Sequence, residues 1–133
     1  MAEIIENMEK NVVQTSADKL EKLIQILKKL FAEREWDSFH SPKNLAMNLM
    51  IESSELAEFF TWISDEKSRE ISEVLKEKIT DEVGDVFLTL AYFCDMLDID
   101  IFEATFNKIE KIKKKYPVEQ FKGKDTKFSV NSV

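Results

Sequence analysis

A chain of 133 residues is long enough to form one domain with a buried core. Its two glycines and two prolines offer little material for tight turns, which disfavours a sheet and favours helices with few connections. The net charge of −7 at pH 7 argues against binding to a nucleic acid polymer or to an anionic membrane. We therefore expect one all-α domain over residues 1–133, with its core at about 17–117 and loosely ordered ends at 1–15 and 118–133.

The cysteine content and the hydropathy indicate a cytoplasmic protein. The single cysteine, Cys94, excludes an internal disulfide and fits a reducing compartment. The sequence has no apolar run typical of a signal peptide and no stretch of about 18 apolar residues. We therefore expect no association with a membrane.

The first half of the sequence predicts two helices separated by an aromatic loop. Ser16 is a candidate N-cap for a helix over about 17–35, in which leucine, isoleucine and phenylalanine recur at helical spacing. Residues 36–41 break that pattern and predict a loop. Ser41 and Pro42 then match the N-cap and first position of a helix, which we expect to run to about residue 63.

The second half predicts two further helices. Residues 64–68 are polar and predict a connection, and a third helix should cover about 69–97, with a break near 77–78. Asp98 and Asp100 are candidate N-caps of a fourth helix, which should end before Tyr116 and Pro117 because proline disfavours helix in the residue before it. Four helices with short connections predict an antiparallel four-helix bundle, or half of one completed by a second subunit.

An acid interrupts the apolar face of the predicted second helix. Glu52 falls in the middle of the stripe made by Leu45, Leu49 and Leu56, where a carboxylate is costly unless a cation or hydrogen-bond donors meet it. Glu55 lies on the shoulder of that stripe, and Glu58 is expected to point away from it. The helix therefore predicts a polar partner for Glu52.

The predicted third helix carries a second pair of acids, Glu82 and Asp85, at the margin of its own apolar face. Residues at i and i+3 are neighbours on a helix, so each pair can converge on one point. Four carboxylates in one pocket would repel one another, and Mg²⁺, which binds carboxylates and substrate phosphates together, would relieve that repulsion. The alternative is an ordinary solvated helix face, because exposed acids are common.

Other metal centres fit the sequence poorly. A di-iron carboxylate bundle needs Glu-x-x-His on two helices, and this chain has one histidine, His40, in a predicted loop. A zinc site is disfavoured for the same reason, since histidine and cysteine clusters are absent from the sequence.

These acids carry a resemblance to a known family. Glu52-x-x-Glu55, followed after 26 residues by Glu82-x-x-Asp85, resembles the ExxE…ExxD signature of the all-α nucleoside triphosphate pyrophosphohydrolases, the MazG-like superfamily. The sequence is most similar to the dCTP pyrophosphatase branch, through residues 31–45, residues 54–62, and the segment from Lys108 to the Tyr-Pro pair at 116–117. The resemblance spans about residues 20–117.

The resemblance implies a reaction and a set of metal ligands. The reaction is Mg²⁺-dependent hydrolysis of a (deoxy)nucleoside triphosphate, dCTP or a related dNTP, to the monophosphate and pyrophosphate in nucleotide-pool sanitation, with Mn²⁺ as a substitute ion. By position, the metal ligands are Glu52, Glu55, Glu82 and Asp85. Glu52 and Glu55 are also the catalytic candidates, and we favour Glu55 as general base. The resemblance further implies a homodimer or homotetramer in which helices of one subunit complete the pocket of another.

The resemblance also implies substrate-binding residues. Trp36 and Trp62 correspond to aromatic residues that enclose the base, and His40 matches a residue of the branch. A further group corresponds to, or lies beside, family positions near the phosphates: Lys108, Lys111, Lys115 and Tyr116.

Two departures from the family pattern concern specificity. Ile112 stands where the family often has asparagine, and Leu27 stands where the branch has a histidine near the base. Losing these polar groups weakens the expectation of cytosine preference. The alternative to an enzyme is a non-catalytic helical module that binds a nucleotide or a partner helix.

Overall fold

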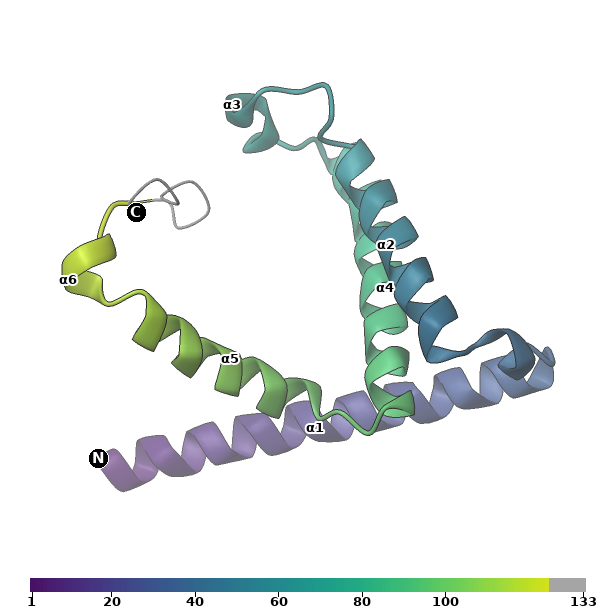
Figure 1. Ribbon diagram of the computed structural model, residues 1–133, viewed down its shortest axis with the longest axis horizontal. Helices are drawn as coiled ribbons and strands as arrows, with labels where there is room; N and C mark the ends of the chain where they lie inside the picture. Colours follow the sequence, from purple (N-terminus) through teal and green to yellow (C-terminus); the bar gives the residue numbers. More distant parts are fainter. Residues whose placement is uncertain (125–133) are drawn as a thin grey trace. The chain divides into compact units, whose positions relative to one another are not determined.

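The computed structural model describes residues 1–124, with residue 2 and residues 5–14 described only as backbone. Over this range the chain forms helices, turns and loops and no strand, which confirms the all-α fold class. Completion of a bundle by a second subunit stays a prediction. The elements in order are α1 (Ala2–Glu33), η1 (Asp37–Phe39), α2 (Pro42–Glu58), α3 (Asp65–Ser68), α4 (Glu73–Met96), α5 (Ile101–Lys115) and α6 (Val118–Phe121) (Figure 1).

The chain divides into two compact units, Met1–Asp98 and Ile99–Val133. The first unit contains α1 to α4, and the second contains α5 and α6. The expectation of one domain over residues 1–133 stays a prediction. None of the described helices is long and apolar enough to cross a membrane.

Helices α2 and α4 lie side by side and run antiparallel, and α1 lies across the end of the pair where α2 begins (Figure 1). Helix α2 starts at Pro42 as predicted, because the backbone N–H of Asn44 donates to Ser41 Oγ at 3.1 Å. It ends at Glu58, short of the expected residue 63. The residues that follow form a turn and then the short helix α3, where we expected only a connection.

Helix α4 begins at Glu73 rather than at about residue 69, because Ser72 caps it: the N–H of Leu75 donates to Ser72 Oγ at 3.3 Å. The predicted break near 77–78 is wrong, since α4 is continuous to Met96. Its antiparallel pairing with α2 brings the two acid-bearing segments to the same level.

Helix α1 is longer than expected. It runs unbroken from Ala2 to Glu33, so the predicted cap at Ser16 is wrong and residues 2–15 are helical rather than loosely ordered. The physical reason is that residues 1–33 contain no glycine or proline that would end a helix. Its C-terminal half supplies Leu27 and Phe31 to the main buried cluster, where they meet Leu45 of α2 and Tyr92 of α4.

The second unit agrees with the predicted boundaries of the fourth helix. Asp100 caps α5, because the N–H of Glu103 donates to Asp100 Oδ1 at 2.9 Å. Helix α5 ends at Lys115, before Tyr116 and Pro117. The expected loose end over 118–133 includes the short helix α6, and residues 125–133 lie outside the described range.

Candidate active site

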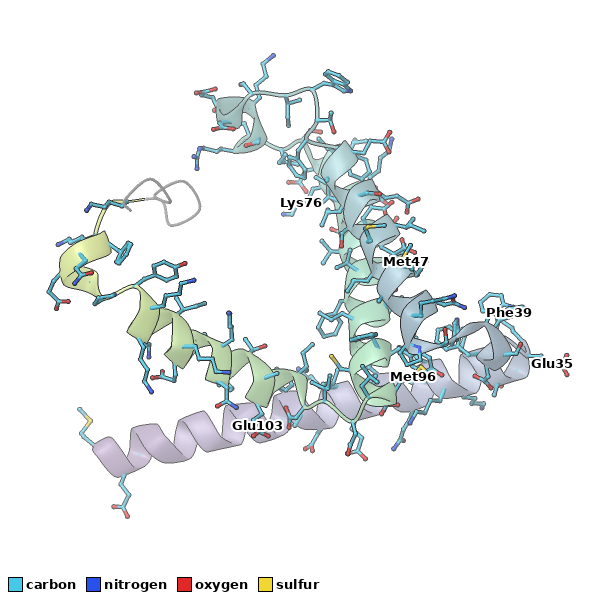
Figure 2. All side chains as sticks on the ribbon, in the orientation of Figure 1. Glu35, Phe39, Met47, Lys76, Met96 and Glu103 are labelled. Atoms are coloured by element: carbon cyan, nitrogen blue, oxygen red, sulfur yellow. The ribbon has the colours of Figure 1, made fainter. Side chains whose placement is uncertain are left out.

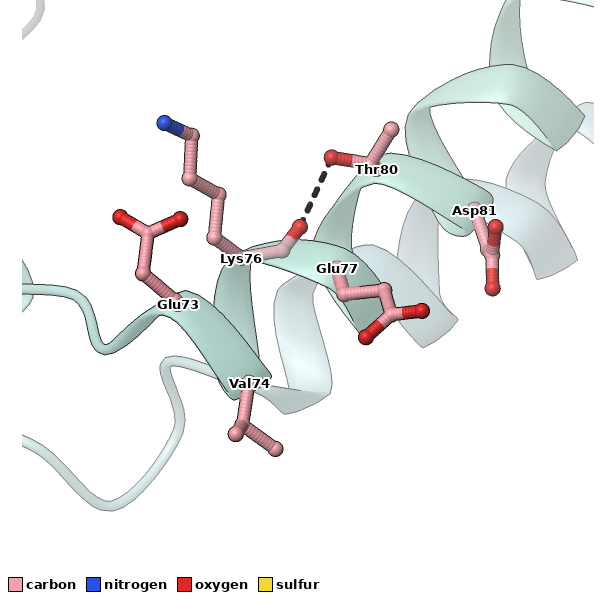
Figure 3. Close-up of a pocket in the computed structure, with 6 residues that line it drawn as sticks. All are labelled: Glu73, Val74, Lys76, Glu77, Thr80 and Asp81. Carbon is pink, nitrogen blue, oxygen red and sulfur yellow. Dashed lines mark hydrogen bonds between the residues drawn. The ribbon is translucent and has the colours of Figure 1, made fainter.

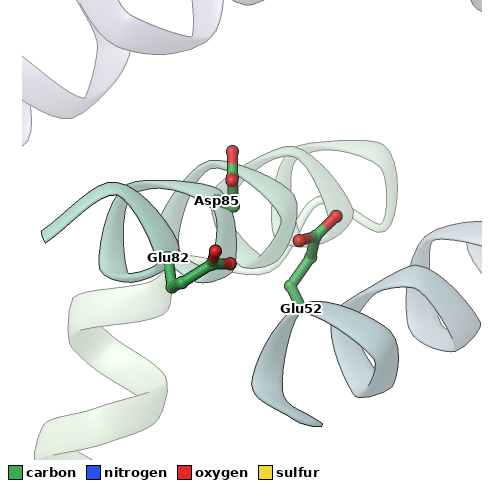
Figure 4. Close-up of side chains that lie close together, drawn as sticks. All are labelled: Glu52, Glu82 and Asp85. Carbon is green, nitrogen blue, oxygen red and sulfur yellow. The ribbon is translucent and has the colours of Figure 1, made fainter. Parts of the chain in front are cut away.

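Three carboxylates converge between α2 and α4. One oxygen each of Glu52, Glu82 and Asp85 lies within 4.8 Å of the other two. Figure 4 shows Glu52 on one helix facing Glu82 and Asp85 on the other. The geometry follows from the sequence, because Glu82 and Asp85 are three residues apart on α4 and the antiparallel α2 brings Glu52 opposite them.

The electrostatics of this cluster favour a cation. Loss of hydration, together with the neighbouring Glu55 and Asp85, raises the pKa of Glu52 above its ordinary value. Loss of hydration and repulsion from Glu55, Asp85 and Asp81 raise the pKa of Glu82 as well. Glu82 Oε2 is also buried without a hydrogen-bond partner among the described residues. A hard divalent cation with oxygen ligands would satisfy this oxygen and cancel the repulsion.

Glu55 lies outside that group of three. It is exposed, and with Glu58, Phe59 and Glu82 it lines a neighbouring hollow. Glu58 therefore shares a surface with Glu55, although the helical pattern suggested that it points away. The metal-ligand roles predicted for the four acids stay predictions; the geometry brings three of the four together.

Two of these acids, Glu52 and Asp85, lie at one end of a cavity of about 180 Å³ between α2 and α4, whereas Glu82 lines the neighbouring hollow. Because the two helices are antiparallel, Leu45 lies level with Tyr92, and Glu52 lies level with Asp85. At 1.5 Å per residue, these two levels are about 10 Å apart. The cavity thus has an acid end and an aromatic end. The aromatic end is lined by Phe31, Trp36, His40 and Tyr92.

His40 occupies the aromatic end as an edge-on ring. Its centroid lies 4.4 Å from that of Phe31 and 5.4 Å from that of Tyr92, and both ring pairs are T-shaped. His40 Nδ1 is buried and has no hydrogen-bond partner in the described part of the chain. His40, which the resemblance implies as a substrate-binding residue and which a loop position alone would let cap or stack, is therefore packed against the core with an unused polar atom.

Trp36 is held by the way α1 ends. The N–H of Glu35 donates to the carbonyl of Ala32 at 3.1 Å, and the N–H of Trp36 donates to the carbonyl of Phe31 at 3.0 Å. This pair of bonds is a Schellman motif, which places Glu35 in the left-handed region with a φ of 55°. Figure 2 shows Glu35 projecting outward at the end of α1. The motif brings the Trp36 ring to 6.3 Å from that of Phe31.

The other predicted substrate-binding residues are not part of this cavity. Trp62 lies in the turn after α2 and is 92% exposed. The lysines Lys108, Lys111 and Lys115 are on α5 and Tyr116 follows it, all in the second unit. There, Lys115 Nζ lies 5.3 Å from the centroid of the Tyr116 ring.

Leu27 and Ile112, the two departures from the family pattern, differ in how far they are buried. Leu27 is 7% exposed and packs in the cluster that contains Phe31 and Tyr92, so it places only methyl groups beneath the aromatic end. Ile112 is 44% exposed on α5.

The sequence reasoning missed two polar residues in the cavity, Asn48 and Thr89. Asn48 precedes Glu52 by one helical turn, and Thr89 follows Asp85 by one turn. A search for polar residues at i±4 from each acid would have found both.

A second acidic surface is not a comparable site. Figure 3 shows a shallow hollow near the start of α4, where Thr80 Oγ1 donates to the carbonyl of Lys76 at 2.7 Å. The acids there, Glu73, Glu77 and Asp81, follow one another along a single helix face. Across the described residues, the convergent group is Glu52, Glu82 and Asp85 alone.

The fold and sequence match proteins of known structure. A pyrophosphatase from Archaeoglobus fulgidus, solved by crystallography, is 38% identical, with a TM-score of 0.70 over 74% of this chain and 93% of that one. The chain belongs to the all-α nucleoside triphosphate pyrophosphohydrolase family. The resemblance seen in the acid motifs is thereby confirmed. No family model matches the sequence.

Mammalian relatives of this chain are named dCTP pyrophosphatase 1. The mouse protein is 31% identical over 112 residues, which are 83% of this chain and 66% of the mouse protein. The bovine protein is 29% identical over 117 residues, covering 86% of this chain and 69% of the relative. The chain thus spans about two thirds of the length of these relatives.

Proposed function

We propose that this pyrophosphohydrolase cleaves a (deoxy)nucleoside triphosphate, dCTP or a related dNTP, into the monophosphate and pyrophosphate. The proposal rests chiefly on three carboxylates that meet within 4.8 Å, two of which, Glu52 and Asp85, line one end of a cavity whose other end is aromatic. Such a cavity suits a ligand with a metal-bound phosphate at one end and a flat base at the other. The biological role that fits is sanitation of the cytoplasmic nucleotide pool.

In this proposal Glu52, Glu82 and Asp85 hold Mg²⁺, or Mn²⁺ in its place, and the orphaned Glu82 Oε2 supports that fit. An ion held there would supply charge stabilisation at the phosphoryl oxygens and would lower the pKa of the attacking water. Glu55, exposed beside the cluster, accepts the proton of that water as general base and is the fourth candidate ligand. The water oxygen bonds to the α-phosphorus, and pyrophosphate leaves with the electrons of the broken bond.

The base binds at the aromatic end. Trp36, which is 46% exposed, offers a ring face for stacking, and His40 Nδ1 offers the unused polar atom. Leu27 contributes no hydrogen bond there, so discrimination between bases rests on fewer polar contacts than in the dCTP branch. We therefore expect activity on dCTP with measurable turnover of other dNTPs.

The site is completed in a homodimer or homotetramer. Trp62, 92% exposed in one chain, is a large apolar side chain that another subunit would cover. The same assembly lets Lys108, Lys111, Lys115 and Tyr116 bind the phosphates, since lysine and tyrosine donors suit phosphate oxygens.

A substrate panel tests the activity. Each dNTP and NTP is incubated with and without Mg²⁺, and pyrophosphate release is read by malachite green after addition of an inorganic pyrophosphatase. We expect Mg²⁺-dependent release that is highest with dCTP or a close relative. Absence of release from every nucleotide would favour the non-catalytic helical module that binds a nucleotide or a partner helix.

Two substitutions test the acids. Glu52→Gln and Asp85→Asn should each remove turnover, by about 100-fold or more, because each removes charge that holds the metal. The helical circular dichroism of both variants should match that of the wild type. Unfolding of both would instead indicate that the acids serve the fold.

A further inference from the structure

One hydrogen-bonded chain links Glu52 to the opposite helix. Asn48 Nδ2 lies 3.2 Å from Glu52 Oε1, one turn along α2, and donates to it. The same nitrogen lies 3.4 Å from Thr89 Oγ1 on α4. Since an amide nitrogen carries two hydrogens, one can be given to each acceptor.

Thr89, the last residue of this hydrogen-bonded series, is tightly packed. Thr89 is 2% exposed, so its side chain is held by the packing of α4 against its neighbours. Among the side-chain hydrogen bonds of the described residues, the bond from Asn48 to Thr89 is the one that joins α2 to α4. The orientation of Glu52 is therefore tied to the helix that carries Glu82 and Asp85.

A glutamate side chain has three rotatable bonds, and ordering it costs conformational entropy each time a ligand is bound. A donor fixed on Glu52 Oε1 removes part of that cost and leaves the second oxygen, Oε2, without a bond to Asn48. Groups that orient metal ligands in this way commonly account for a large part of metal affinity.

We propose that Asn48 is a positioning residue, which holds the Glu52 carboxylate toward Glu82 and Asp85 and is itself held by Thr89. The inference rests on the metal-binding role that the proposed function gives to Glu52. It assigns Asn48 no contact with the reacting atoms.

The test is calorimetric titration of the full chain with Mg²⁺ or Mn²⁺ alone, without nucleotide. Asn48→Ala should weaken metal binding by about 10–100-fold, because Glu52 is no longer oriented. Thr89→Val, which removes the acceptor but keeps the shape, should weaken it less, and Thr89→Ser should rescue it. The double variant Asn48→Ala/Thr89→Val should bind no more weakly than Asn48→Ala, because Thr89 acts through Asn48.

Asn44 provides a matched control one turn earlier on the same helix. Asn44 Nδ2 donates to the carbonyl of Phe39 at 2.9 Å and has no contact with the acids. Asn44→Ala should lower the thermal stability while leaving the metal Kd unchanged. If Asn48→Ala does not fold, Asn48→Leu, which is close in shape and lacks the donor, carries the same expectation.

The outcomes separate the inference from the proposed function. An Asn48 variant that binds metal within about twofold of the wild type, while Glu52→Gln does not bind, overturns the positioning role and leaves the enzyme intact. Wild-type protein that binds neither ion overturns it as well. If no nucleotide is hydrolysed yet the Asn48 variants lose metal affinity as expected, the proposed function fails and the positioning role stands.

Discussion

The two ends of the α2–α4 pair differ in how much the chain buries them. At the end crossed by α1, Leu45 is 5% exposed and Tyr92 is 7% exposed. Toward the other end, Val74 is 69% exposed and Trp62 is 92% exposed. The acids Glu52 and Asp85 lie between these regions. The burial of apolar side chains that stabilises this unit is therefore concentrated beneath the aromatic end of the cavity. The acid end has less apolar burial and depends more on the backbone hydrogen bonds of α2 and α4.

The largest effect on stability is expected at Phe31. Phe31→Ala should lower the free energy of unfolding by about 3–5 kcal/mol, because it empties the centre of the cluster made with Leu27, Leu45 and Tyr92. Val83→Ala, at a residue 49% exposed on α4, should change it by less than about 0.5 kcal/mol. Denaturant unfolding measures both. If both variants lost the same free energy of unfolding, the two ends of the α2–α4 pair would not differ in their contribution to stability.

A smaller effect on stability is expected at Glu82, where a substitution should lower the activity but raise the stability of the metal-free protein. Glu82→Gln should reduce turnover about 100-fold, because it removes a charge from the proposed metal site. Without metal at neutral pH, the same variant should melt at a higher temperature than the wild type, because repulsion from Glu55, Asp85 and Asp81 is relieved.

The pH dependence of that difference follows from its cause. Lost hydration and neighbouring acids raise the pKa of Glu82 above its ordinary value of 4.5, so the folded state binds this proton more tightly than the unfolded chain. The wild type should therefore lose stability as the pH rises from about 4.5 through the raised value, whereas Glu82→Gln should lose less, because only Glu52 then keeps a raised pKa in this cluster. Thermal melts at several pH values check this, and added Mg²⁺ should stabilise only the wild type. A variant that melts lower without metal would reveal a stabilising partner of Glu82.

The smallest expected effect concerns the turn before Trp36. Glu35→Gly should raise the free energy of unfolding by about 0.5–1 kcal/mol, since glycine adopts a φ of 55° without steric cost. The matched control is Glu21→Gly on the exposed face of α1, which should lower it by about 1 kcal/mol. Denaturant melts measure both. A loss of stability in the Glu35 variant would contradict the strain assigned to this turn.

The features that were predicted correctly from the sequence are those that depend on neighbouring residues in the chain. Ser41 and Pro42 fixed the start of α2, Asp100 fixed the start of α5, and the misplaced charge of Glu52 pointed to the acids of α4. The prediction of an N-cap at Ser16 was wrong. A serine caps a helix only where the residues before it are not helical, and residues 2–15 are already part of α1.

The remaining features depend on distance in space rather than along the chain. The bond from Asn48 to Thr89 depends on the register between α2 and α4, which no single helix specifies. Glu55 lies beside Glu82 but outside the group of three, and its predicted role as a ligand stays a prediction, because helical spacing gives a direction for a side chain and not its rotamer. The meeting of Trp36 and His40 with Tyr92 similarly required the crossing of α1 over the pair.

The Schellman motif at the end of α1 has a consequence for engineering the base preference that we propose for this site. Its two hydrogen bonds involve only backbone atoms, so Trp36 can be exchanged for another side chain without moving the chain. An inserted residue at 34 or 35 would instead break the register of these two hydrogen bonds and change the direction of the side chain at position 36. Libraries that seek a new base preference should therefore vary the identity of residue 36 and keep the length of this turn constant.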